Sequence, residues 1–176
     1  MKRSLILATI ILLGSFSFNL YAQQPTQAKN QSSDQPYKIQ ATKITIGNAV
    51  YAQKVLWAWK YYDNNTLDKA ADMFADDIIA TLPDGTLIKG KDNFIKGMAD
   101  YRNSFALVVS EVAACTTLKT PDDPEREVVS IWGMETDTNK DGTVTKVHLN
   151  EVWFFNKQGK VVEFHQLAAK DAPDKK

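Results

Sequence analysis

The apolar residues of this chain change from a helical to a strand-like spacing after about two thirds of its length. In the first part, apolar side chains recur three or four residues apart, which predicts helices over 48–64, 67–76 and 92–104. A short strand over 78–82 and the turn Pro83-Asp84-Gly85 separate the second helix from the third. Later runs predict strands over 106–118, 127–136, 143–156 and 160–168. This order predicts an α+β fold, a cone-shaped roll with three N-terminal helices packed on a curved antiparallel sheet of four to six strands.

The N-terminus has the layout of a secretory signal peptide over residues 1–22. Lys2 and Arg3 give a positive start, an apolar run follows from Leu5 to Leu13, and Ala22 offers a small residue at the cleavage point. A retained membrane anchor is the alternative, but a membrane span needs about 20 apolar residues and this run is shorter. We therefore expect export to the periplasm or the extracellular space, with no membrane attachment after cleavage.

The rest of the chain divides into one domain between two polar segments. Residues 23–42 are rich in Gln, Ser, Asn and Pro and have too little aliphatic content to form a core, which predicts a disordered linker. Residues 171–176 form a polar tail, and 43–170 are long enough for one domain.

Charge and composition exclude several classes of function. The full chain has 21 basic and 21 acidic residues, so loss of Lys2 and Arg3 leaves a slightly acidic protein without the basic stripe of nucleic-acid binders.

Cys115 is the only cysteine and lies in an apolar run, which favours a buried side chain over a nucleophile. The segment Asp137–Gly142 resembles the start of a calcium loop but has His148 at the twelfth position, so its last four residues, 139–142, are interpreted as a hairpin turn. We predict neither a metal site nor a cofactor.

The last two predicted strands contain more polar residues than core strands usually do. A sheet with one wet face alternates apolar with polar residues. The segment 143–168 departs from this rule at six polar positions: His148, Asn150, Glu151, Glu163, His165 and Gln166.

Three local motifs resemble the nuclear transport factor 2-like superfamily, and its SnoaL-like branch in particular. They are Phe-Ala-Asp-Asp at 74–77, placed at the end of the second helix, Gly90 followed by Asp-Asn-Phe-Ile at 92–95, and Glu-Val-Trp-Phe-Phe at 151–155 followed by Gly-Lys-Val-Val at 159–162. The resemblance covers about residues 48–168. It implies the cone fold, but one function does not follow because this scaffold hosts enzymes, binding modules and adaptors.

The resemblance to ketosteroid-isomerase-like members places three catalytic roles on this chain. Those enzymes use a carboxylate base, a tyrosine and a protonated acid. Leu82 occupies the position of the base and Ala58 that of the tyrosine, whereas Glu151 occupies that of the acid. The isomerase reaction is therefore not expected.

The resemblance also implies which side chains face the cone. Leu149, Glu151, Trp153 and Phe155 point inward on one strand, as do Val162, Phe164, Gln166 and Ala168 on the next. Glu151 is the candidate catalytic acid or base. The predicted ligand-binding residues are Ala58, Tyr62, Leu82, Met98, Trp153, Phe164 and Gln166. His148 and His165 lie on the outer face, unless the register slips by one residue and turns both inward.

Three functions remain open. The first is an exported domain that binds a small, largely apolar ligand in the cone. The second is an enzyme, a cyclase, isomerase or dehydratase, that uses Glu151 with Gln166, Tyr62 or a histidine. The third is an interaction module that forms a homodimer through the outer sheet face, where Val152 and Phe154 are expected to be exposed. Dimerisation is compatible with the first two functions.

Overall fold

The computed structural model describes residues 36–37, 39 and 43–171. Everything below concerns the described residues of one compact unit, Ile39–Lys176. The predicted signal peptide (1–22) lies outside the described residues, as does most of the predicted linker and tail.

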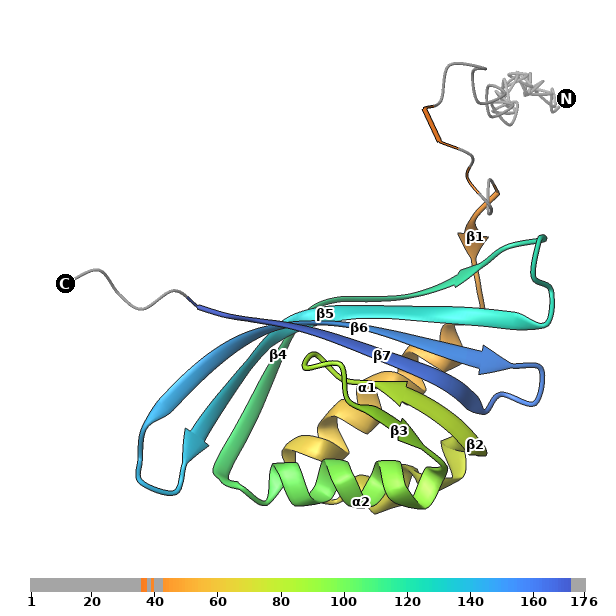
Figure 1. Ribbon diagram of the computed structural model, residues 1–176. Coiled ribbons are helices and arrows are strands. Elements are labelled where there is room, and N and C mark those ends of the chain that lie inside the picture. Colours follow the sequence, from red (N-terminus) through yellow and green to blue (C-terminus); the bar gives the residue numbers. More distant parts are fainter. Residues whose placement is uncertain (1–35, 38, 40–42, 172–176) are drawn as a thin grey trace, which may run out of the picture. The chain divides into compact units, whose positions relative to one another are not determined.

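Two α-helices bury one side each against a sheet. Helix α1 (Ala49–Asp63) begins at Asn48, whose side chain accepts a hydrogen bond from the backbone N–H of Val50. Helix α2 (Lys91–Arg102) buries Phe94, Met98 and Arg102, which are four residues apart and therefore lie on one face. Both helices lie on the same side of the sheet (Figure 1).

The second predicted helix is shorter than expected and is a 3₁₀ helix, η1 (Leu67–Met73). Its buried residues Leu67, Ala70 and Met73 are three residues apart, which matches the three residues per turn of a 3₁₀ helix. The sequence prediction of a helix to residue 76 was wrong, because strand β2 (Phe74–Thr81) begins at once and Phe74 pairs with Val161. The Phe-Ala-Asp-Asp motif therefore lies in a strand.

The described part of the chain contains one seven-stranded sheet, one strand more than the upper limit expected from the sequence. Its order is β1-β4-β5-β6-β7-β2-β3, and all neighbours are antiparallel except β2 and β7, which are parallel. The strands not yet bounded are β1 (Thr45–Ile46), β3 (Leu87–Lys89), β4 (Phe105–Lys119), β5 (Arg126–Asn139), β6 (Val144–Asn156) and β7 (Val161–Lys170). The α+β prediction is confirmed, and the missed β1 is too short, at two residues, to show a period.

Bulges bend the long strands around the helices. One lies in β4 between Val112 and Ala114, opposite Gly133 of β5. A Cβ atom on Gly133 would collide with the backbone carbonyl of Glu111, so only glycine fits this close approach.

A second bulge lies between β6 and β7 and changes one sequence prediction. Phe155 pairs with Val161, so Val162 is the extra residue of the bulge and Val161 is fully buried in its place. The prediction that Val162 points into the cone was therefore wrong.

The core fills the space between the helices and the concave face of the sheet. Its centre is a group of aromatic rings from η1–β2, α2, β6 and β7, with ring centroids 4.7 to 6.1 Å apart: Phe74, Phe94, Trp153 and Phe164. Three of these rings, those of Phe94, Trp153 and Phe164, also line a small cavity beside the cluster.

Candidate functional site

Two adjoining cavities lie between the helices and the sheet. The inner one has room for about one water molecule, at roughly 30 Å³. The outer one measures about 610 Å³, which falls within the usual range for small-molecule sites. The residues that line both cavities are Tyr62, Met98, Glu135, Leu149 and Gln166.

Glu151 is buried beside the inner cavity and accepts three hydrogen bonds. The indole N–H groups of Trp59 and Trp153 donate to its Oε2 over 2.5 and 3.0 Å, and the Gln166 amide donates to Oε1 over 2.8 Å. Burial raises the pKa of Glu151, while the three donors favour its charged form and oppose that shift. Both oxygens are engaged, so Glu151 connects α1, β6 and β7.

A second pair of acids, Glu135 and Asp137, lies on the same concave face of β5. Glu135 is 7% exposed and Asp137 only 2%, and their carboxyl groups lie close enough to shift the pKa of each other. Burial, the charges of Asp137 and Glu151, and the shared interaction with the Asp137 carboxyl raise the pKa of Glu135 to about 8. Burial also raises the pKa of Asp137, against the opposing influence of Glu135 and Arg102. At neutral pH the pair therefore retains a proton.

The pair is less well satisfied than the other buried acids. Asp63 accepts a 2.8 Å hydrogen bond from the Ser110 hydroxyl, and Glu151 has its three N–H donors. Among the described residues, by contrast, Oδ1 of Asp137 has no N–H or hydroxyl partner. Arg102 is close enough to lower the pKa of Asp137, but its guanidinium donates to the backbone carbonyls of Asp63 and Phe105.

Tyr62 lies where the two cavities meet. Burial raises the pKa of its hydroxyl strongly, and the nearby charge of Glu135 adds to the shift. Tyr62 is therefore a neutral phenol at physiological pH and can donate a hydrogen bond.

The structure places all eight sequence-predicted site residues around these cavities. Six line the inner one: Ala58, Tyr62, Met98, Trp153, Phe164 and Gln166. Glu151 also lines the inner cavity, and Leu82 lines the outer one, just beyond the end of β2. Their roles in binding or catalysis remain predictions.

Glu135 and Asp137 were not among the predicted site residues: Glu135 lay in the predicted strand 127–136 without an assigned role, and Asp137 lay just outside that strand. The strand in fact continues to Asn139. Val129, Ile131, Glu135 and Asp137 are all buried, so the two acids continue the inward alternation of β5. Acids at positions i and i+2 that extend an apolar strand face were the signal that could have revealed them.

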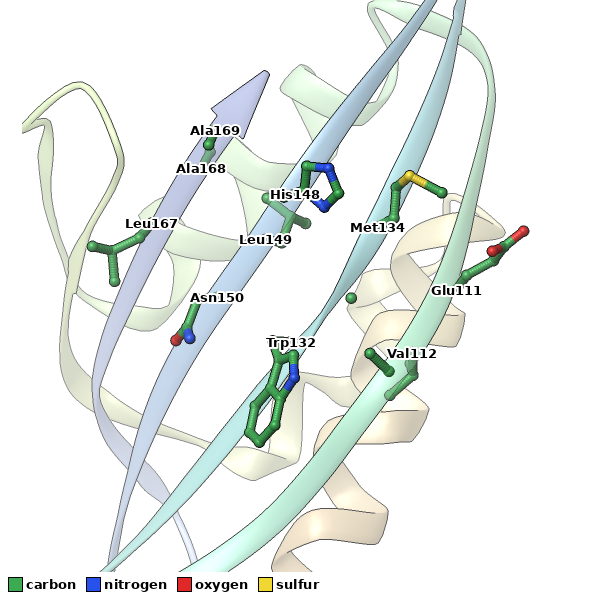
Figure 2. Close-up of a pocket in the computed structure, with 12 residues that line it drawn as sticks. Glu111, Val112, Trp132, Met134, His148, Leu149, Asn150, Leu167, Ala168 and Ala169 are labelled. Atoms are coloured by element: carbon green, nitrogen blue, oxygen red, sulfur yellow. The ribbon is translucent and has the colours of Figure 1, made fainter. Parts of the chain in front are cut away.

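The opposite face of the sheet carries both histidines. His148 contacts Asp171 at 2.7 Å, and His165 contacts Glu163 at 2.8 Å, both away from the cone. A shallow trough of about 850 Å³ crosses this face. Figure 2 shows its lining on neighbouring strands, including Val112, Trp132, His148, Asn150 and Leu167.

Val152 and Phe154 were expected to be exposed on this outer face, but both are half-buried. Exposed apolar residues that line the trough instead include Val112, Trp132 and Leu167, at 41%, 42% and 60% exposure.

Two further properties concern only the residues that the structure describes. These residues include no group of three side chains suited to hold a metal ion. Within the same part of the chain, no helix combines the length and the apolar character of a membrane span.

Comparisons with known proteins identify the fold. No protein-family model matches the sequence, and no curated protein matches it. Three similar solved structures each have a TM-score of 0.57. An NTF2-like protein from Anabaena variabilis is 16% identical, over 70% of this chain and 89% of its own. A protein provisionally named a SnoaL-like polyketide cyclase, from Shewanella denitrificans, is 11% identical over 69% and 92%. A protein provisionally named a scytalone dehydratase, from Novosphingobium aromaticivorans, is 11% identical over 69% and 85%.

These likenesses confirm the predicted resemblance at the level of the fold. The chain has the nuclear transport factor 2-like fold. The SnoaL-like neighbour shares this arrangement of a curved sheet and helices. At such low identity, the reactions named for the neighbours say nothing direct about this chain.

Proposed function

We propose that this protein binds a small, largely apolar ligand in the cone cavity. The observation that carries the proposal is the cavity of about 610 Å³, whose lining is mostly apolar and whose polar groups are few. Leu82, Ile88 and Met98 would contact the apolar body of the ligand, and Tyr62, Glu135 and Gln166 would contact one polar end. Such a combination is typical of ligand sites.

A neutral, environment-sensitive dye such as Nile red tests this proposal with the full chain. Leu82 is half-buried at the cavity, so Leu82→Trp should fill space there and weaken dye binding by about tenfold or more. Trp132→Glu, on the outer face, is the matched control and should leave dye binding unchanged. The proposal fails if Leu82→Trp binds the dye as wild type does, or if Trp132→Glu abolishes binding.

A second candidate function is acid–base catalysis of the cyclase, isomerase or dehydratase type. The buried acids Glu151 and Glu135 beside one cavity favour it. Glu151 already accepts three hydrogen bonds, so it has little remaining capacity for a substrate. Given a substrate that is turned over, Glu151→Gln with unchanged activity would exclude Glu151 as the catalytic group.

We also propose that the protein is exported, with residues 1–22 removed, and that it dimerises through the outer face. The N-terminal sequence supports export, and N-terminal sequencing of the secreted protein should begin at Gln23.

The exposed Val112, Trp132 and Leu167 support dimerisation, because exposed apolar side chains that gather on one face often mark interfaces.

A further inference from the structure

Glu135 of the acid pair Glu135–Asp137 faces a cavity, and neither acid forms an ion pair with a base among the described residues. Glu135 lines both the inner and the outer cavity, and Asp137 lies beside it on the same strand face. Among the described residues, no lysine, arginine or histidine forms an ion pair with either carboxyl group. Buried carboxyl groups are usually paired, so this site lacks the positive charge that such an arrangement normally contains.

The charged and titratable groups around the pair come from three elements and are mostly acidic or phenolic. Helix α1 contributes Tyr62 and Asp63, and α2 contributes Tyr101 and Arg102, while Glu151 lies on the neighbouring strand β6. Arg102 donates to backbone carbonyls and Lys60 lies 4.0 Å from Asp63, so two positive charges stand against four carboxyl groups. At the rim of the outer cavity lie Asp84 and Lys170, whose opposite charges offset each other.

We propose that the cone cavity takes a small, mostly apolar amine, whose ammonium group binds at the Glu135–Asp137 pair. This inference rests on the proposed ligand-binding function and adds the chemical class of the ligand. An ammonium ion in the cavity would supply the missing positive charge and donate a hydrogen bond to the carboxyl group of Glu135, which lines the cavity, while Asp137 lies behind it on the same strand face. An anionic ligand would meet several acids in a poorly hydrated site, so carboxylates and phosphates are excluded by repulsion.

The rest of the cavity fits the same class of ligand. The rings of Tyr62 and Tyr101 line it and can contact a cation through their faces. Ile88, Met98 and Val147 offer apolar contacts for a hydrocarbon body.

Amine binding must be coupled to proton release. In the unliganded protein near neutral pH, burial and neighbouring charges leave a proton on the pair, mainly on Glu135, whose pKa is about 8. When an ammonium ion binds, it stabilises both carboxylates, and this proton leaves to the solvent. The amine keeps its own proton, because ordinary alkyl ammonium groups lose theirs only near pH 10.4.

Three compounds with one carbon skeleton test the inference: phenylbutylamine, phenylbutanol and phenylbutanoate. Calorimetric titration of the full chain near pH 7 should give an affinity for the amine about tenfold above that for the alcohol, with the carboxylate weakest. Repeating the titration in buffers with different ionisation enthalpies measures the proton release. The amine affinity should also rise by roughly tenfold from about pH 6 to about pH 8, whereas the alcohol affinity stays flat.

Glu135→Gln removes one acid while it preserves the shape of the side chain. It should weaken amine binding by about tenfold and abolish most of the proton release, with alcohol binding unchanged. Glu163→Gln, on the outer face, is the matched control and should bind all three compounds as wild type does.

The outcomes separate this inference from the function on which it rests. If the alcohol binds as tightly as the amine without proton release, the amine inference is overturned and the ligand-binding function stands. Tightest binding of the carboxylate also overturns it. If none of the three compounds binds and Nile red is not bound in the cavity, the ligand-binding function itself fails.

Discussion

The two faces of strands β5, β6 and β7 contain the same kinds of polar residue in very different states. On the outer face, Glu163 lies 2.8 Å from His165 and 3.1 Å from Arg126, and Asp171 lies 2.7 Å from His148. On the inner face, Glu135 and Asp137 form no ion pair among the described residues, and the pKa of Glu135 is raised, mainly by burial, to about 8. The chemistry of these acids thus depends on which side of the sheet they occupy, because the outer acids are partly exposed and paired with bases whereas the inner acids are buried without such a pair.

Removal of a carboxyl group should cost far more on the inner face than on the outer one. Glu151→Ala leaves the N–H donors of Trp59, Trp153 and Gln166 without their acceptor, and should lower the free energy of unfolding by about 3 kcal/mol. Glu163→Ala removes only partly exposed ion pairs, so a loss below about 1 kcal/mol is expected. Urea denaturation of both variants measures the difference, and equal losses would remove the distinction between the two faces.

The stability of the protein should decrease as the pH rises, through the inner acids. The folded pKa of Glu135, about 8, lies above its ordinary value of 4.5, so between these values the folded state binds more protons than the unfolded state. The contribution of Glu135 to the free energy of unfolding is therefore greatest below about pH 4.5. This contribution decreases progressively up to about pH 8, by roughly 2 to 4 kcal/mol.

Glu135→Gln tests this pH dependence directly, because a glutamine carries no proton that must be lost. The variant should have a flatter profile of unfolding free energy against pH and should be more stable than wild type near pH 8. The outer-face variant Glu163→Gln should retain the wild-type slope. A wild-type profile that is flat over this range would contradict the raised pKa of Glu135.

A smaller effect is expected for the outer face, where the change should alter association rather than folding. Trp132→Glu places a charge among the exposed Val112 and Leu167 and should weaken the proposed dimer by at least about tenfold. The free energy of unfolding should change by less than about 1 kcal/mol. Sedimentation at several protein concentrations measures the association, and a wild-type protein that stays monomeric throughout would reject the dimer.

Much of the sheet could be predicted because alternation in a strand follows from local backbone geometry. Successive side chains point to opposite faces, so Glu151 and Gln166 could be assigned to one side and His148 and His165 to the other. The structure has this arrangement, with Gln166 donating to Glu151 across the β6–β7 pair. The same rule failed at Val162, because a bulge inserts one residue and shifts the alternation.

The sequence by itself determined three features: the helix and strand periods, the α+β order, and the division of the last strands into two faces. All three depend on residues that are close along the chain. Tertiary structure alone decided that Glu135 meets Tyr62 and Gln166 around one cavity, with Asp137 beside it on the same strand face. That outcome depends on bulges, on the close approach at Gly133 and on the docking of α1 and α2, which set distances between residues far apart in sequence. The unusual protonation of the acid pair follows from these distances, because desolvation and charge coupling act through space rather than along the chain.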